Sequence, residues 1–119
     1  MKTYENFINP KIEYWDNDQK RFEMWFLNNK LHREDGPAYQ EWYDNGQKRY
    51  ESWILNKKYH REDGPAYQIW YKNGKKWREE WWLNNKKYSR EEWVDELKNI
   101  GSKYYDEQRM LLDVEKYNL

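Results

Sequence analysis

The sequence predicts a mainly β fold: a repetitive antiparallel β-meander of about 28-residue units, capped by a C-terminal pair of α-helices. The nonapeptide HREDGPAYQ occurs twice, at His32–Gln40 and His60–Gln68, one step of 28 residues apart. Nine Trp, twelve Tyr and three Phe accompany 37% charged residues. Disordered chains are poor in aromatic residues, so this composition indicates a folded protein whose core is built from rings. Turn-forming residues separate the short aromatic segments, which is typical of hairpins.

The 28-residue step also relates many positions outside the nonapeptide. A fixed period of this length is the sequence signature of a repeat architecture, in which each unit buries its rings against the next. The related positions are Trp15, Tyr43 and Tyr71; Asn17, Asn45 and Asn73; Lys20, Lys48 and Lys76; Glu23, Glu51 and Glu79; Trp25, Trp53 and Trp81; and Leu27, Leu55 and Leu83. We therefore expect two full units, a partial unit before them and a degenerate end.

Each unit is expected to form strands joined by two tight turns. Asn45-Gly46 predicts the first turn, of type I′, because both residues tolerate positive φ. Asn56-Lys57 predicts the second, since Asn is the commonest non-Gly residue at such angles. In the segment that links one unit to the next, we expect Gly36 at positive φ and Pro37 to impose an extended entry into the following strand.

The pattern ends at Tyr88, and a helical tail is predicted after it. Ser89 and Glu92 form an S-x-x-E capping box, the signature of a helix start. Gly101 stands where a glycine would end this helix. A second helix is expected from about residue 102 to about residue 116. Its expected buried residues include Met110, Leu111 and Val114.

These boundaries divide the chain into residues 1–88, a β-hairpin repeat array, and residues 89–119, a helical C-terminal cap, within a single structural domain. A repeat array needs caps, because its last unit would otherwise expose its rings and its strand edge. The tail is therefore expected to cover the end of the sheet; the alternative is that the tail binds a partner. An uncovered edge could also pair two chains into a homodimer.

Composition limits the classes of function. Twenty-two Lys and Arg balance 22 Asp and Glu, so the net charge is zero, which disfavours nucleic acid as the main partner and a polybasic membrane anchor. The absence of Cys excludes disulfides, thiolate zinc sites and a Cys nucleophile. No segment has the apolar run of a signal peptide or a membrane span, so we expect a cytoplasmic protein of a bacterium or a host cell. No phosphate-binding loop or metal-spaced cluster occurs, so neither a cofactor nor a metal is predicted.

The duplicated HREDGPA segments raise the question of catalysis. His32 with Asp35, and His60 with Asp63, could act as acid–base pairs or as metal ligands. Catalytic groups converge in one pocket, however, whereas duplicated loops line up along an array. We therefore predict structural turns and no catalytic residue, in a protein that is not an enzyme. The turn residues are His32, Asp35, Gly36, His60, Asp63 and Gly64.

Two sets of rings are expected on opposite sides of the long strands. Trp25, Trp53 and Trp81 share a side with leucines, which favours a packing spine over a stacking ladder for sugars or bases. A single-layer sheet would leave the other set of rings open to solvent or to a partner. The partner-binding candidates are Phe22, Phe26, Tyr50, Trp77 and Trp82.

The unit W-Y-x-N-G-x-K-x-x-E-x-W-x-L-N, together with H-R-E-D-G-P-A, resembles variant MORN-type repeats. The match runs through Trp42–Gly46 with Glu51 and Trp53, and through Trp70–Gly74 with Glu79 and Trp81. It covers roughly residues 12 to 88. The resemblance implies β-hairpin arrays and a non-catalytic binding scaffold. Such repeats look like those of bacterial antitoxins or immunity proteins, and of large DNA viruses and phages.

The sequence leaves several functions open. The first is a protein-binding inhibitor of a toxin or defence enzyme, as an antitoxin, an immunity protein or a phage-encoded anti-defence protein; Trp, Tyr and Arg dominate binding hot spots. The second is a glycan- or choline-type cell-wall-binding module. The third is an enzyme that uses the two His/Asp pairs, and the remaining alternatives are single-stranded nucleic acid binding and self-assembly. We expect the first, with another protein as the partner.

Overall fold

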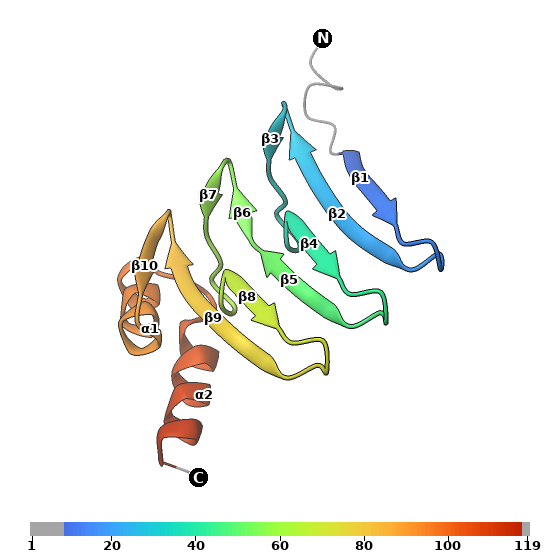
Figure 1. Ribbon diagram of the computed structural model, residues 1–119. Helices are drawn as coiled ribbons and strands as arrows, with labels where there is room; N and C mark the ends of the chain where they lie inside the picture. Colours follow the sequence, from blue (N-terminus) through green and yellow to red (C-terminus); the bar gives the residue numbers. More distant parts are fainter. Residues whose placement is uncertain (1–8, 118–119) are drawn as a thin grey trace.

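The computed structural model describes residues 9–117, which form a curved antiparallel sheet with two helices at its C-terminal end (Figure 1). The strands are β1 (Asn9–Tyr14), β2 (Lys20–Leu27), β3 (Lys30–Leu31), β4 (Tyr39–Trp42), β5 (Lys48–Ser52), β6 (Ile54–Leu55), β7 (Lys58–Tyr59), β8 (Tyr67–Trp70), β9 (Lys76–Leu83) and β10 (Lys86–Tyr88). The helices are α1 (Arg90–Asn99) and α2 (Tyr105–Tyr117). The prediction of a mainly β, antiparallel fold followed by two helices is confirmed.

The strands along the main sheet lie in the order in which they occur in the sequence. The main sheet has eight strands in the order β1-β2-β4-β5-β8-β9-β10, with β3 beside β2, while β6 and β7 form a separate two-stranded sheet. Figure 1 shows the tips β2–β3, β6–β7 and β9–β10 projecting at the same end of the strands. The molecule measures 45 × 45 × 19 Å, so it is flat and the two faces of the sheet are its largest surfaces.

The wide turn of each hairpin differs from the predicted type I′ turn. Gly46 has a φ of 86°, but Asn45 is not at positive φ. The Gly46 N–H donates to the Tyr43 carbonyl (3.0 Å), and the Tyr43 N–H donates to the Gln47 carbonyl (2.9 Å), which is the three-residue loop of a type I turn followed by a left-handed residue. The Asn45 side-chain oxygen accepts from the Gln47 N–H (3.0 Å), which stabilises this loop with Asn45 outside the left-handed region.

Type I′ geometry occurs instead at the narrow turn of each hairpin. Both central residues have φ between 50° and 69° at Asn28-Asn29, Asn56-Lys57 and Asn84-Asn85. The prediction of a tight turn at these positions is confirmed. Asn favours this backbone because its short polar side chain tolerates the left-handed region.

The glycine of each HREDGPA segment has a different role from the one predicted. Neither Gly36 nor Gly64 is at positive φ, so the expectation of a left-handed glycine is wrong. A Cβ at Gly36 would lie 2.7 Å from Cζ of Arg33, and a Cβ at Gly64 would lie 2.8 Å from Cζ of Arg61. Glycine is therefore present because a guanidinium lies directly against the backbone.

Helix α1 begins and ends as the sequence predicts. Ser89 is its N-cap, and both hydrogen bonds of a capping box join Ser89 and Glu92. Gly101 follows the end of the helix with a φ of 71°. The predicted capping box and the glycine stop are therefore confirmed.

The main hydrophobic cluster joins α1 to the last hairpin. Trp93, Val94 and Leu97 of α1 are fully buried, and they pack against Leu83 of β9. Partly buried rings and side chains surround this cluster: Trp81, Tyr88, Tyr105 and Leu112. The tail therefore covers the C-terminal end of the sheet. Neither α1 nor α2 is long and apolar enough to cross a membrane.

Helix α2 does not bury the residues that its sequence suggests. Met110, Leu111 and Val114 are 59%, 40% and 40% exposed, so the prediction of their burial is wrong. The helix instead turns Gln108 inward, where the Gln108 Nε2 donates to the Asp63 carbonyl (3.2 Å), and packs Leu112 against the cluster. Gln108 and Leu112 thus face the protein in place of the three predicted residues.

Candidate functional site

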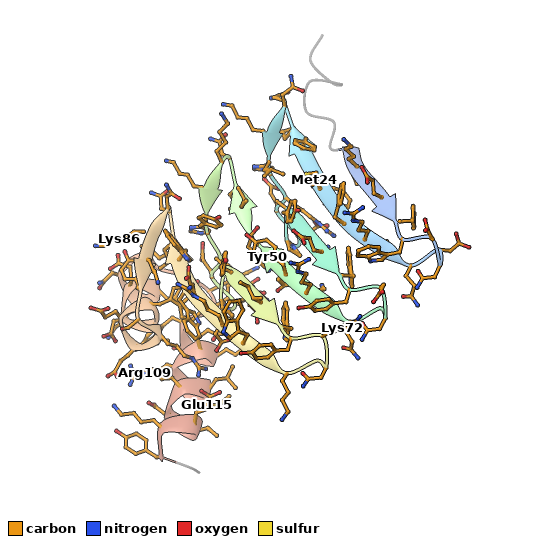
Figure 2. All side chains as sticks on the ribbon, in the orientation of Figure 1. Met24, Tyr50, Lys72, Lys86, Arg109 and Glu115 are labelled. Atoms are coloured by element: carbon orange, nitrogen blue, oxygen red, sulfur yellow. The ribbon has the colours of Figure 1, made fainter. Side chains whose placement is uncertain are left out.

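The sheet has two chemically different faces, because side chains alternate along each strand and residues paired across strands point to the same side. We call one side the ring face, on which Met24 and Tyr50 lie (Figure 2). The paired rows of the ring face are Phe22, Glu41, Tyr50, Ile69 and Arg78, and Met24, Tyr39, Ser52, Tyr67 and Glu80. We call the other side the carboxylate face, whose central row is Glu23, Gln40, Glu51, Gln68 and Glu79.

On the carboxylate face, buried glutamates are surrounded by donors. Glu23 is 5% exposed and accepts from Lys20 (2.8 Å) and from the Trp25 indole (2.6 Å). Arg33 lies 3.5 Å from the same carboxylate. Burial raises the pKa of Glu23, but the hydrogen bonds from Lys20 and Trp25 and the charges of Lys20 and Arg33 outweigh burial, so the pKa lies below its ordinary value.

The next glutamate of this row repeats the arrangement 28 residues later. Glu51 accepts from the Trp53 indole (3.3 Å), from Gln68 (2.6 Å) and from Lys48 (3.3 Å), and Arg61 lies 3.7 Å away. In the part of the chain that the structure describes, no buried side-chain nitrogen or oxygen is left without a hydrogen bond. The carboxylate face is therefore satisfied from within.

The three tryptophans of the predicted spine lie on the carboxylate face. The guanidinium of Arg33 covers the Trp25 ring at 4.2 Å, and that of Arg61 covers the Trp53 ring at 3.9 Å. Trp81 instead packs against the α1 cluster. Cation–π contacts of this kind stabilise the loop that carries the arginine, so the tryptophans support the HREDGPA segments.

The histidines hold these segments to the next hairpin. The Asn56 N–H donates to His32 Nδ1 (2.8 Å), and the Asn84 N–H donates to His60 Nδ1 (2.9 Å). Asp35 accepts from Arg33 (3.0 Å) and Asp63 from Arg61 (2.8 Å), so neither aspartate is the hydrogen-bond partner of its histidine. Among residues 9–117, no three His, Asp or Glu form a group that could hold a metal. The geometry supports the predicted structural turns.

The ring face carries a groove made of three adjoining hollows. Their volumes are about 270, 400 and 310 Å³. Glu41 lines all three, and Tyr39 and Tyr50 each line two, which makes the hollows one groove. The remaining lining residues are Trp15, Arg21, Phe22, Trp42 and Arg49 in the first; Tyr43, Arg49, Ile69, Trp70, Tyr71 and Trp77 in the second; and Leu31, Ser52, Ile54 and Tyr59 in the third. We call it the ring-face groove.

Tyrosine rings form the floor of the ring-face groove. Tyr50 contacts Tyr39 and Tyr67 edge to face, with ring centroids 5.5 and 5.1 Å apart, and Tyr59 continues the chain from Tyr67 to Trp82. Burial raises the pKa of Tyr39 to about 12 and raises that of Tyr50 as well. The floor is therefore uncharged at neutral pH, and its hydroxyls remain hydrogen-bond donors.

In each of three hairpins, a β-bulge at the start of the wide turn redirects one side chain. The pairing registers leave Arg21, Arg49 and Trp77 as the extra, unpaired residues. Arg21 lies over the Trp15 ring at 4.8 Å and Arg49 over the Tyr43 ring at 5.6 Å. Bulges often re-aim side chains at functional sites, and here they give the groove its arginines and its most exposed ring.

The predicted partner-binding residues are placed unequally. Phe22 lines the first hollow, Tyr50 the second and third, and Trp77 the second. Trp82 lies on the same face and contacts Tyr59 at 4.9 Å between ring centroids. Phe26 pairs with Leu31 at a hairpin tip and lines none of the three hollows.

Sequence reasoning predicted Tyr50 but missed the arginines of the groove and the other tyrosines of its floor. Positions 21, 49 and 77 are 28 residues apart, and this spacing was the available signal. The change from Arg to Trp at the third position hid it. Tyr39 and Tyr67 occupy equivalent positions in the two nonapeptides, so their repetition looked like part of the turn.

A separate open cleft of about 600 Å³ lies between the HREDGPA loops and the connection from α1 to α2. Its lining includes Arg33, His60, Arg61 and Asp63. Arg33 and Arg61 are engaged by the aspartates of their own loops, and His60 Nε2 lies 2.9 Å from Glu62. The two arginines and His60 of this cleft are therefore engaged by carboxylates of their own loops.

Comparisons of the chain with protein-family models, with curated proteins and with solved structures find no match.

Proposed function

We propose that this protein is a non-enzymatic protein-binding scaffold, an array of 28-residue hairpin units, that inhibits a partner protein through its ring face. The observation that carries this proposal is the ring-face groove, which is lined by Trp, Tyr and Arg and lies on the side of the sheet opposite Trp81 and Leu83, where α1 packs. Trp, Tyr and Arg are the residues that dominate the binding energy of protein interfaces.

The contrast between the two faces supports the assignment of the ring face as the binding surface. The glutamates of the carboxylate face are already bonded to Lys, Trp, Gln and Arg. The ring face instead leaves large rings accessible: Trp77 is 57% and Tyr71 is 49% exposed. Burying exposed apolar surface of this kind against a partner contributes favourably to the free energy of binding.

The resemblance to MORN-type repeats of antitoxins, immunity proteins and phage proteins supports a toxin or a defence enzyme as the partner, in the cytoplasm of a bacterium or of a host cell. An inhibitor of this kind needs no cofactor, metal or catalytic residue of its own. The two HREDGPA segments then act as structural links between units, as their bonds to the following hairpins suggest.

Affinity capture from the native host tests this proposal. Wild-type protein should retain one partner in stoichiometric amount, and Trp77→Ala and Arg49→Ala should each lower the captured amount about tenfold, as expected for hot-spot residues. Tyr117→Ala is the matched control, because this ring is 61% exposed on α2. Equal capture by the wild type and both groove variants would contradict the role of the ring face.

A glycan- or choline-binding module is the second candidate, favoured by one observation. Tyr71 and Trp77 form a tilted ring pair with centroids 5.9 Å apart at the end of the groove, where a sugar ring or a quaternary ammonium could stack. A glycan array with no hits would eliminate this candidate.

Among the described strands, β1 has a neighbour on one side only, so a homodimer in which two sheets pair edge to edge is a further candidate. Analytical ultracentrifugation of the full chain measures this directly. A monomer at all concentrations would remove the homodimer without affecting the proposed role of the groove.

A further inference from the structure

We propose that the ring-face groove binds a polyproline-II segment of the partner, with an apolar residue at every third position and acidic residues between them. This inference rests on the proposed protein-binding function and deepens it, because it names the element that the groove would recognise. Three observations support it: the spacing of the hollows, the chemistry of their lining and their charge.

The first two hollows are lined by residues that stand 28 positions apart. Trp15, Arg21, Phe22 and Trp42 in the first correspond to Tyr43, Arg49, Tyr50 and Trp70 in the second. The first hollow lies mainly on β2 and β4, and the second mainly on β5 and β8, the next two strands of the sheet. Since neighbouring strands lie about 4.8 Å apart, equivalent points recur about every 9.6 Å across the strands.

A polyproline-II helix matches this spacing. It has three residues per turn and rises about 3.1 Å per residue, so every third side chain faces the same way at intervals of about 9.3 Å. In an α-helix, a side chain returns to the same face after seven residues, or about 10.5 Å. It would therefore move about 0.9 Å out of register with the hollows at each such repeat. A β-strand repeats its side chains on one face every 6.8 Å or so. Of the three regular conformations, polyproline II fits two hollows with successive turns.

The lining also supplies what a polyproline-II segment needs. Its backbone has no internal hydrogen bonds, so its carbonyls are free to accept from the protein. Arg21 and Arg49 each place guanidinium N–H donors beside a ring, at Trp15 and Tyr43. Aromatic-lined grooves are an established mode of polyproline-II recognition, because the stiff segment loses little entropy on binding.

The charge of the groove favours acidic residues in the segment. The lining of the first two hollows carries Arg21, Arg49 and one carboxylate, Glu41. Glu41 already accepts from the Tyr39 hydroxyl (2.7 Å) and lies 3.8 Å from Arg49. Arg21 contacts the Trp15 ring, so its charge is presented beside the first hollow. Acidic side chains flanking the apolar positions would therefore be attracted to the groove.

Titration of the nitrogen-15-labelled full chain with synthetic peptides tests the inference. The probe is a peptide of three Leu-Pro-Glu triplets. The register control has one extra proline at both junctions between triplets, so no two of its leucines are three positions apart. The charge control replaces each glutamate with lysine. An oligosaccharide of chitin and a short thymidine oligonucleotide test the other classes of binding partner.

The tryptophan indole signals report which face binds. We expect the in-register peptide to shift the signals of Trp15 and Trp77 in a saturable manner. The signals of Trp25 and Trp53, on the carboxylate face, should stay in place. The register and charge controls should bind at least about tenfold more weakly, because each loses one full contact site or gains repulsion. Trp77→Ala should weaken the in-register peptide, whereas Tyr117→Ala should not.

Several outcomes would overturn the inference. Equal binding of the in-register and register-control peptides would exclude recognition by spacing, and shifts produced by the chitin fragment or the oligonucleotide instead would assign the groove to another class of partner. The proposed function is tested separately by capture of the native partner. If capture depends on Trp77 and Arg49 while no triplet peptide binds, the protein-binding function stands and the polyproline-II inference fails.

Discussion

The two HREDGPAYQ segments have one sequence and share several bonds, yet they lie in different surroundings. In both, arginine binds the aspartate two residues later, at 3.0 and 2.8 Å. In both, the histidine accepts from the turn of the next hairpin. The Glu34 and Asp35 side chains are 81% and 86% exposed, whereas those of Glu62 and Asp63 are 33% and 41% exposed.

The helical tail causes this difference. The Trp93 indole donates to the Arg61 carbonyl (3.1 Å), and Gln108 donates to the Asp63 carbonyl (3.2 Å), so both helices are fastened to the second loop. The comparison shows that the nonapeptide itself determines the shape of the turn, while the element that follows determines its exposure. The first loop connects two units, whereas the second also binds both helices of the C-terminal cap.

The largest expected effect comes from removing the contact between cap and loop. Trp93→Ala should lower the free energy of unfolding by about 3–5 kcal/mol, because a fully buried ring is lost together with its bond to Arg61. Chemical denaturation measures this loss. Hydrogen exchange should then protect residues 60–66 no better than residues 32–38.

Met110→Ala is the control for this prediction, because Met110 is an apolar residue of the same tail that is 59% exposed. It should change the free energy of unfolding by less than about 0.5 kcal/mol. If the two variants were equally stable, the cap would not depend on the second loop.

The second-largest expected effect on stability comes from the glycine that both loops contain. Gly36→Ala and Gly64→Ala should each cost about 1–3 kcal/mol, since the new Cβ would push the guanidinium of Arg33 or Arg61 off its tryptophan. Gly64→Ala should cost more, because the backbone of Arg61 is held by Trp93 and yields less.

A double-mutant cycle isolates this contact. Gly36→Ala should cost clearly less when Arg33 is already alanine, because the clashing group is gone. Additive losses in the denaturation midpoint would contradict the account of the glycine as space for the guanidinium.

Much of the fold could be predicted from local sequence. The Asn pairs of the narrow turns, the Ser89–Glu92 capping box and the stop at Gly101 act through bonds within a few residues, so their geometry follows from neighbours in the chain. The antiparallel order follows from short links between strands. Two predictions failed because residue type does not signal how the side chain folds: Arg33 folds back over Gly36, and Gln108 of α2 turns inward to a carbonyl of the second loop.

The site was predictable in part for the same reason. The alternation of side chains places Phe22, Tyr50 and Trp82 on one face. The arginines of the groove were missed because a bulge changes which way a residue points and no residue type signals a bulge; the 28-residue spacing of positions 21, 49 and 77 was the only signal. The first two hollows are each built from several strands, and their shape depends on how far each ring reaches across, as the Tyr43 hydroxyl does in donating to the Trp70 carbonyl.

A smaller effect is expected at the histidines. His32→Ala and His60→Ala each remove the acceptor of one turn N–H and should cost about 0.5–1.5 kcal/mol, with the unfolding measured in urea. The double variant should still capture the partner at wild-type level, since neither ring lines the ring-face groove. Loss of activity without loss of stability would instead favour the enzyme hypothesis.

The smallest expected effect is a difference between the two loops in how their glutamates stabilise the fold as the pH changes. Burial raises the pKa of Glu62, but bonds from His60 and Ser102 outweigh it, so the folded pKa lies below the ordinary 4.5. A carboxylate with a depressed pKa stabilises the fold above its unfolded pKa and loses that contribution as the pH falls through the folded value. Glu62→Gln should therefore be less stable than the wild type at neutral pH, and the difference should shrink as the pH falls below 4.5 and through the lower folded pKa. Glu34→Gln, at the equivalent position of the open loop, should show a smaller difference at neutral pH, because its carboxylate is 81% exposed and lies 3.8 Å from His32. The measurement is the thermal unfolding of both variants from neutral to acidic pH. Identical pH dependence of their stability would mean that the cap leaves the electrostatics of the second loop unchanged.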